Sequence, residues 1–291
     1  MTDRILVTGS GGQLGTDLVD HLAGRPGIEV VGVDHATLDV TNRAAVLTAV
    51  EQIGPRWIVH AAAWTAVDPC ESDPDRAFAV NAYGVRTVAE AARLTGAHLT
   101  VISTDYVFDG TLDRPYDEWD RPNPLSVYGR SKLGGEHEAG PGATVVRTSW
   151  LFGAHGPNMV RTVVALAGRA SAAGTPLRFV DDQRGCPTGC DDLAATVADL
   201  TLSRCPGIFH VTNTGPTSWY GLARDVAAAA GFDPGLIEPI TTAELDPPRP
   251  APRPANSVLD GRALRVLGAA ALPDWHEPME RLVKLLAEED L

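Results

Sequence analysis

The chain has 291 residues, 44% of them hydrophobic, which suits one large α/β unit or a main domain with a smaller partner. Its net charge of −13 argues against nucleic acid as a partner, because a phosphate backbone requires a basic face. No apolar run approaches the roughly 18 residues that a membrane span needs, and the N-terminus leads directly into an apolar strand instead of a signal peptide. We therefore expect a cytoplasmic protein with no membrane partner.

A glycine pattern separates the first predicted strand, residues 4–8, from the first predicted helix. Gly9, Gly12 and Gly15 form GxxGxxG, and Gln13 and Leu14 lie between the last two glycines. Such a loop allows a tight turn and a close approach of the backbone to a pyrophosphate, at which the helix N-terminus points. Because the strand–turn–helix context is present, the pattern predicts a dinucleotide-binding site.

The second predicted strand, residues 29–33, ends at Asp34, nineteen residues past Gly15. An acid at this distance is expected to hydrogen-bond the adenosine ribose, which favours NAD over NADP. Asp39 is either a contact to the adenine edge, together with Val40, or a helix-capping acid. The third predicted strand, residues 56–60, leads into Ala61, Ala62 and Ala63. Either their small side chains let a flat cofactor lie close to the backbone, or this stretch is a plain turn.

A long helix is predicted from residue 73 to residue 96. Asn81 falls within its apolar stripe, which suggests a buried hydrogen-bonding role. The next strand, residues 99–103, ends in Ser103 and Thr104, whose hydroxyl groups lie at the same sheet edge and can bind a substrate oxygen.

Tyr128 and Lys132 are four residues apart on a predicted helix and therefore share one face. A free tyrosine has a pKa of about 10 and holds its proton too tightly for exchange at neutral pH. A nearby ammonium favours the phenolate, so the pair is suited to proton transfer to or from a carbonyl oxygen.

Alternating strands and helices predict an α/β fold with a Rossmann-type doubly wound parallel sheet and a smaller C-terminal substrate-binding domain. We place the dinucleotide-binding domain at residues 1–150, with strand and helix returns around residues 175–212, and the mainly substrate-binding part at 151–291. The proline-rich stretch 246–254 is either a surface linker or a carrier of Arg249 and Arg253 as phosphate ligands.

In this order the motifs resemble the extended short-chain dehydrogenase/reductase superfamily and, within it, the dTDP-4-dehydrorhamnose reductase family. The resemblance runs from residue 9 to about residue 260. It rests on seven blocks: residues 12–15, 61–68, 103–110, 124–129 with Lys132, 147–150, 182–183 with 185 and 187–188, and 253–254 with 256–257.

The resemblance implies NADPH- or NADH-dependent reduction of dTDP-4-dehydro-L-rhamnose at C4, the last step of dTDP-rhamnose biosynthesis. Tyr128 would give its proton to the C4 oxygen, Lys132 would lower the pKa of Tyr128 and hold the nicotinamide ribose, and Thr104 would bind the carbonyl oxygen. The positions that it places near the dTDP-sugar are Val67, Asp68, Thr104, Asp105, Tyr106, Trp150, Arg253, Asn256 and Ser257.

The chain departs from the family at its metal site. Some members pair as dimers through a metal bound by glutamates, where this chain has Thr16-Asp17 and Cys190-Asp191. We therefore predict no metal, and a homodimer is left open. Two other functions also stay open: reduction of another dTDP-4-keto-6-deoxyhexose in a natural-product pathway, and a non-catalytic, cofactor-binding regulatory subunit.

Overall fold

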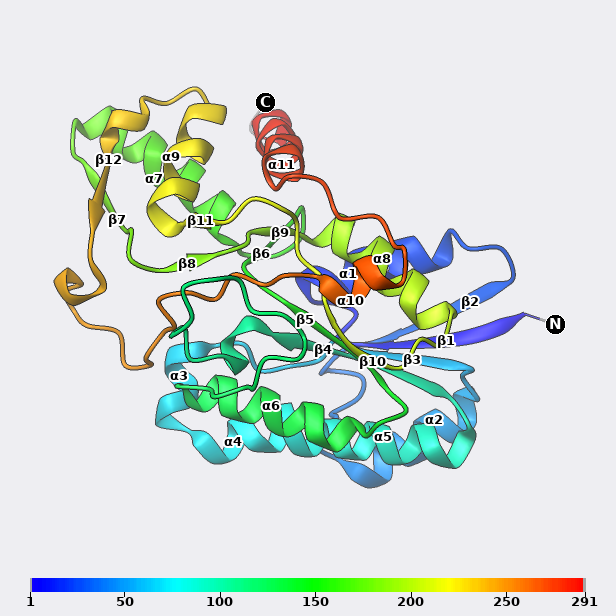
Figure 1. Cartoon of the computed structure of the whole chain (residues 1–291). Coiled ribbons are helices and arrows are strands. Elements are labelled where there is room, and N and C mark those ends of the chain that lie inside the picture. Colours follow the sequence, from blue (N-terminus) through cyan, green and yellow to red (C-terminus); the bar gives the residue numbers. More distant parts are fainter. Residues whose placement is uncertain (1, 290–291) are drawn as a thin grey trace.

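The computed structural model describes residues 2–289. The outer ends of the two predicted domains, Met1 and residues 290–291, lie outside the described residues. Its centre is a six-stranded sheet in which every neighbouring pair is parallel (Figure 1). The strands, in spatial order, are β10 (Gly207–His210), β5 (Thr144–Thr148), β4 (His98–Thr104), β3 (Trp57–His60), β1 (Asp3–Thr8) and β2 (Ile28–Val33). The order reverses between β1 and β3, which is where open α/β sheets bind their ligands.

Both faces of the sheet are covered by helices because successive side chains along each strand point to opposite sides. Ile5 and Val7 of β1 pack into one apolar cluster and Leu6 packs into the other. The first cluster includes α1 (Gln13–Ala23), α8 (Cys190–Leu202) and α10 (Arg262–Val266). The second includes α2 (Arg43–Ile53), α5 (Gly84–Thr95) and the end of α6 (Val127–Ala139).

A smaller unit lies beyond the carboxyl edge of the sheet (Figure 1). A third apolar cluster joins its helices α7 (Met159–Ala173), α9 (Trp219–Ala229) and α11 (His276–Glu289). Its strands are β7 (Leu177–Val180) with β12 (Ile237–Ile240), β6 (Leu151–Phe152) with β9 (Thr188–Gly189), and β8 (Arg184–Gly185) with β11 (Thr217–Ser218). The remaining elements are α3 (Val67–Ser72), α4 (Pro74–Phe78) and the short helical turns η1 (Ala79–Tyr83), η2 (Asp105–Val107), η3 (Pro234–Leu236) and η4 (Thr242–Glu244).

The predicted parallel α/β sheet is confirmed, with two refinements. The sixth strand, β10, and the covering helix α8 come from the predicted return around residues 175–212, whereas β7 joins the smaller unit. The predicted helix 73–96 is divided into α4, the π-helical turn η1 and α5. None of the described helices is both long enough and apolar enough to cross a membrane.

Candidate active site

A cavity of about 520 Å³ lies at the carboxyl edge of the sheet. It brings together residues from the ends of four strands, from α1, from α6 and from the smaller unit. Its lining residues are Gly9, Gly12, Gln13, Leu14, Gly15, Ala61, Ala63, Thr65, Val67, Ile102, Ser103, Thr104, Asp105, Tyr106, Tyr128, Lys132, Thr148, Ser149, Trp150, Leu151, Pro157 and Trp219. Most of the residues predicted for the catalytic and cofactor sites are therefore neighbours in space.

The glycine loop is packed too closely to accept side chains. Gly9 has a φ of +73°, and a Cβ on it would lie 2.7 Å from the backbone nitrogen of Ala62. A Cβ on Gly15 would lie 2.0 Å from the carbonyl oxygen of Gly9. The loop thus turns sharply between β1 and α1, and it passes directly over the residues that follow β3.

Asp34 lies beside this loop, and a Cβ on Gly11 would be 3.6 Å from the Asp34 Cβ. Its Oδ1 accepts hydrogen bonds from the Thr37 amide (3.0 Å) and hydroxyl (2.9 Å), and the hydroxyl bond is the main reason that the pKa of Asp34 is lowered. Asp39 similarly accepts two bonds from Thr41, while the cap of α2 is Asn42. Asp34 is therefore an anion at neutral pH.

If Asp34 selects the cofactor, Asp34→Ser should shift the preference towards NADPH, since the carboxylate repels a 2′-phosphate and accepts a bond from a free hydroxyl. We expect the ratio of kcat/KM for NADPH over NADH to rise about tenfold, which corresponds to roughly 1.4 kcal/mol. Asp20→Ser, on the exposed side of α1, is the matched control. An unchanged ratio would show that Asp34 does not distinguish NADH from NADPH at the adenosine ribose.

Helix α6 presents Tyr128 and Lys132 to the cavity, and both are buried. The Ser126 hydroxyl caps the helix by accepting from the Gly129 amide at 3.1 Å. A Cβ on Gly129 would lie 2.2 Å from the Tyr106 carbonyl oxygen, so this glycine lets the first turn of α6 approach η2. The four-residue spacing thus produces the shared face that was predicted.

Thr104 lines the cavity beside Tyr128, and its hydroxyl donates to Asp105 Oδ1 at 2.9 Å. The ring of Tyr106 meets the ring of Tyr128 edge to face at 5.7 Å. Lys132 Nζ donates to the carbonyl oxygen of Ile102 at 2.7 Å. These contacts bind α6 to the carboxyl end of β4.

The electrostatics of the pair correct one expectation. Burial raises the pKa of Tyr128 above its usual value, and the nearby Thr104 hydroxyl only partly opposes this rise. The predicted lowering of the Tyr128 pKa by Lys132 is therefore not seen, because desolvation of the phenolate dominates. Burial also lowers the pKa of Lys132 to about 8 and raises that of Asp105 to about 6.

Asn81 has the buried hydrogen-bonding role predicted for it. In the turn η1, its amide accepts from Trp64 N (2.8 Å) and donates to Trp64 O (3.0 Å) and to Ser131 Oγ (3.0 Å). Ser131 Oγ in turn donates to the carbonyl of Tyr128 at 2.8 Å. One side chain therefore joins the loop after β3 to the tyrosine-bearing turn of α6.

Asn81→Ala should lower the free energy of unfolding by about 2 kcal/mol or more, because the Trp64 backbone groups lose their partner in a partly buried place. Chemical denaturation measures this loss. Asn123→Ala is the matched control, since this exposed amide donates to Asp109 at the surface and its removal should cost much less. Equal losses in the two variants would contradict the role of Asn81.

Asp68, in the first turn of α3, holds the proline-rich stretch against this helix. Its carboxylate accepts from Arg253 Nη1 (3.0 Å) and Nη2 (2.9 Å), and from Arg249 Nη1 (3.3 Å). The Arg253 hydrogen bond is the main reason that the pKa of Asp68 falls to about 2. Asp68, Arg249 and Arg253 are thus brought together next to Val67, although none of the three lines the cavity itself.

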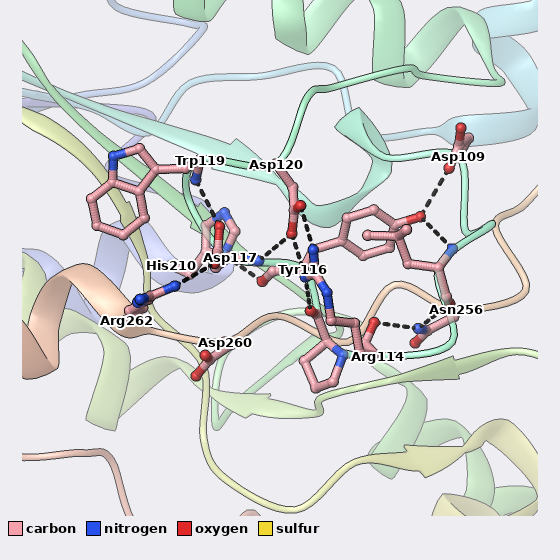
Figure 2. Close-up of polar contacts among 12 residues, drawn as sticks. Asp109, Arg114, Tyr116, Asp117, Trp119, Asp120, His210, Asn256, Asp260 and Arg262 are labelled. Carbon is pink, nitrogen blue, oxygen red and sulfur yellow. Dashed lines mark hydrogen bonds and ion pairs between the residues drawn. The ribbon is translucent and has the colours of Figure 1, made fainter.

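Asn256 and Ser257 bind neighbouring loops instead of lining the cavity. Figure 2 shows Asn256 reaching the backbone of Arg114 (3.0 Å), with Tyr116 on the same loop donating its hydroxyl to Asp109 (2.8 Å). The Ser257 hydroxyl donates to the carbonyl of Arg184 at 3.2 Å. These contacts attach the 111–126 loop and β8 to the chain that follows the proline-rich stretch.

Trp150 and Trp219 form one wall of the cavity, and the sequence analysis did not identify Trp219. Their rings are stacked with centroids 3.6 Å apart. Trp150 has a φ of +49°, an uncommon conformation for a bulky residue and one that occurs often at functional sites. Trp219 comes from α9, sixty-nine residues further along the chain, so no local pattern connects the two.

The cavity suits a dinucleotide. Gly12 caps α1 without any side-chain hydrogen bond, so the first amides of this helix face the cavity and can bind a pyrophosphate. Three buried polar atoms on the lining have no hydrogen-bond partner among the described residues: Gln13 Oε1, Asp105 Oδ2 and Thr148 Oγ1. Polar atoms of this kind are expected where a ligand binds.

At the positions where some family members bind a metal, this chain has two acids that pair with histidines. Asp17 contacts His155 at 3.6 Å, and Asp191 contacts His21 at 2.7 Å. Within residues 2–289, no group of three or more His, Cys, Asp or Glu side chains is arranged to hold a metal ion.

A parallel sheet with a glycine loop at its switch point, and a buried Tyr–Lys pair facing the same cavity, defines a dinucleotide-dependent oxidoreductase of the short-chain dehydrogenase/reductase class. The model of one protein family, described as the RmlD substrate binding domain, matches residues 3–288. The chain belongs to this family, and the resemblance identified from the sequence is confirmed.

Individual relatives support this assignment. A Sinorhizobium fredii protein named dTDP-4-dehydrorhamnose reductase is 40% identical, over 98% of each chain. A Streptomyces antibioticus protein named probable dTDP-4,6-dihydroxy-2-methyloxan-3-one 4-ketoreductase is 42% identical, over 98% of this chain and 97% of its own. The crystal structure of dTDP-4-dehydrorhamnose reductase from Bacillus anthracis in complex with NADP is similar with a TM-score of 0.91 at 37% identity, over 97% of this chain and 99% of its own.

Proposed function

We propose that this chain reduces dTDP-4-dehydro-L-rhamnose at C4 to dTDP-L-rhamnose, the last step of dTDP-rhamnose biosynthesis, with NADPH or NADH. The observation that carries the proposal is the cavity that joins the glycine loop to Thr104, Tyr128 and Lys132. When bound there, the cofactor supplies the hydride. Gly9, Gly12, Gln13, Leu14 and Gly15 would hold its pyrophosphate, Asp34 and the Asp39–Val40 turn its adenosine end, and Ala61, Ala62 and Ala63 its flat face.

Tyr128 is the proton donor in this proposal. Its phenol is protonated at neutral pH. It would give this proton to the oxygen at C4, which becomes more basic as the hydride arrives. Thr104 would bind the same oxygen as charge develops on it. Lys132, with its ammonium beside the strand end, would hold the nicotinamide ribose and stabilise the phenolate left after transfer.

The sugar would lie between the Tyr128 face and the tryptophan wall. Val67, Asp105, Tyr106 and Trp150 surround this space or adjoin it, and residues 151–291 supply most of the remaining substrate side. Arg253 would turn towards the diphosphate from its place on Asp68, while Asn256 and Ser257 would fix the loop that carries it.

The test supplies purified protein with dTDP-4-dehydro-L-rhamnose and follows NADPH, then NADH, by absorbance. Oxidation of either cofactor with dTDP-L-rhamnose as the sole product is the expected result. Binding of a cofactor without its consumption would overturn the proposed substrate and leave the dinucleotide site standing.

A second candidate is a 4-ketoreductase for another dTDP-4-keto-6-deoxyhexose, favoured by the 42% identity to the Streptomyces antibioticus relative. Competing sugars in the same assay separate the two, because the true substrate has the highest kcat/KM. The regulatory-subunit function is disfavoured, since Thr104, Tyr128 and Lys132 are all present and face one cavity. A homodimer and a cytoplasmic location stay predictions, which sedimentation analysis and cell fractionation would test.

A further inference from the structure

One face of α6 carries a third buried residue in register with the catalytic pair. Tyr128, Lys132 and Glu136 are spaced four apart, and each contacts one of the last three residues of β4. Tyr128 lies beside Thr104 in the cavity lining, Lys132 Nζ donates to the Ile102 carbonyl at 2.7 Å, and Ser103 Oγ donates to Glu136 Oε1 at 2.5 Å. Glu136 therefore completes the set of contacts that fixes the strand end against the helix.

Glu136 is also the partner of Arg147 on β5. Arg147 Nε donates to Oε1 at 2.9 Å and Nη2 donates to Oε2 at 2.7 Å, which is a two-bond pairing. The two side chains are only 2% and 4% exposed. In such surroundings each charge depends on the other for compensation.

Arg147 is fixed from its other side by neutral groups. Its Nη1 lies 3.4 Å from His210 Nε2, and its guanidinium lies over the ring of Phe108. Burial lowers the pKa of His210 to about 3, so the ring is neutral and its Nδ1 donates to the carbonyl of Tyr116, a residue pair drawn in Figure 2. The guanidinium therefore stays directed at Glu136.

We propose that Glu136 is a positioning residue for the Tyr128–Lys132 pair, acting through its contact with the end of β4 and through its negative charge one helical turn from the Lys132 ammonium. The proposal rests on the proposed cofactor role of Lys132.

The charges around Lys132 give the sign of the expected effect. Among the titratable groups near Lys132 are His60 on β3, Asp105 on η2, Arg147 on β5, and Tyr128 and Glu136 on α6 itself. His60 and Tyr128 are neutral at pH 7, because burial lowers the pKa of His60 to about 3 and raises that of Tyr128. Burial lowers the pKa of Lys132 to about 8 while Glu136 raises it, so removing the Glu136 charge must lower it further.

The experiment compares Glu136→Gln with the wild type by titrating NADPH binding, followed by its fluorescence, from pH 6 to pH 9. In the wild type, affinity should fall above about pH 8 as Lys132 loses its proton. In Glu136→Gln the midpoint should move about one pH unit lower, which weakens binding at pH 8 several-fold but little at pH 6. The pH dependence of kcat/KM should move in the same direction.

Glu138→Gln is the matched control, because this carboxylate lies on the same helix but pairs with Arg86 at the surface. It should keep the wild-type midpoint. If Glu136→Gln fails to fold, the double variant Glu136→Gln/Arg147→Met replaces it, because it leaves no unpaired buried charge. The midpoint of its pH-dependent NADPH binding should still be lowered.

A wild-type midpoint in Glu136→Gln, or in the folded double variant, would overturn the proposal. Because NADPH binding needs no sugar, this result is separate from the proposed reaction. If the midpoint is lowered but the protein reduces no 4-keto sugar, the positioning role of Glu136 is supported and the proposed substrate is rejected. If the wild type does not bind NADPH, both proposals are rejected.

Discussion

Tyr128→Phe should lower kcat by about 10²–10⁴-fold while leaving the fold and NADPH binding close to wild type. The substitution removes one hydroxyl group, which is the proposed proton donor to the C4 oxygen and lies beside Thr104. The ring keeps its buried position and its edge-to-face contact with Tyr106. The loss should therefore appear in the chemical step, measured as single-turnover oxidation of bound NADPH.

Tyr116→Phe is the matched control for this experiment. Tyr116 is also buried, and its hydroxyl donates to Asp109 at 2.8 Å, outside the cavity. It should cost some stability through the lost hydrogen bond but leave kcat within about threefold of wild type. If Tyr128→Phe retained near wild-type turnover, the proton would have to come from another group, and Tyr128 would lose its assigned role.

The local parts of this site could be read from the sequence. The strand–GxxGxxG–helix pattern located the glycine loop because such a turn needs glycines at a fixed spacing, and Gly9 and Gly15 are as crowded as the pattern implies. Tyr128 and Lys132 were predicted to share a face because helical geometry relates residues four apart. Both predictions depend on short stretches of chain.

The parts that depend on distant segments could not be read in this way. Trp219 meets Trp150 only because the start of α9, in the smaller unit, reaches the residues that follow β5. Arg253 was interpreted either as part of a surface linker or as a phosphate ligand. Neither alternative reveals its contact with Asp68, which joins residues 185 positions apart. The direction of the Tyr128 pKa shift also follows from burial, which one helix face does not reveal.

Burial decides how the site works as well as where it lies. The same desolvation raises the pKa of Tyr128 and lowers that of Lys132, so the resting pair approaches a neutral phenol beside an ammonium that holds its proton weakly. Such a pair suits reduction, in which the tyrosine must begin protonated. The oxidation direction, which begins from a phenolate, should therefore be favoured only at higher pH.

Gly15→Ala should abolish measurable NADPH binding at micromolar concentrations, because its Cβ would lie 2.0 Å from the Gly9 carbonyl oxygen and would push the loop away from β1. Fluorescence titration measures the affinity, and thermal unfolding separates it from loss of the fold. Gly142→Ala is the matched control, since a Cβ there meets no atom within 4 Å. If Gly15→Ala bound NADPH as tightly as wild type, the pyrophosphate could not lie against this loop, and the site of the cofactor would have to be sought elsewhere along the sheet edge.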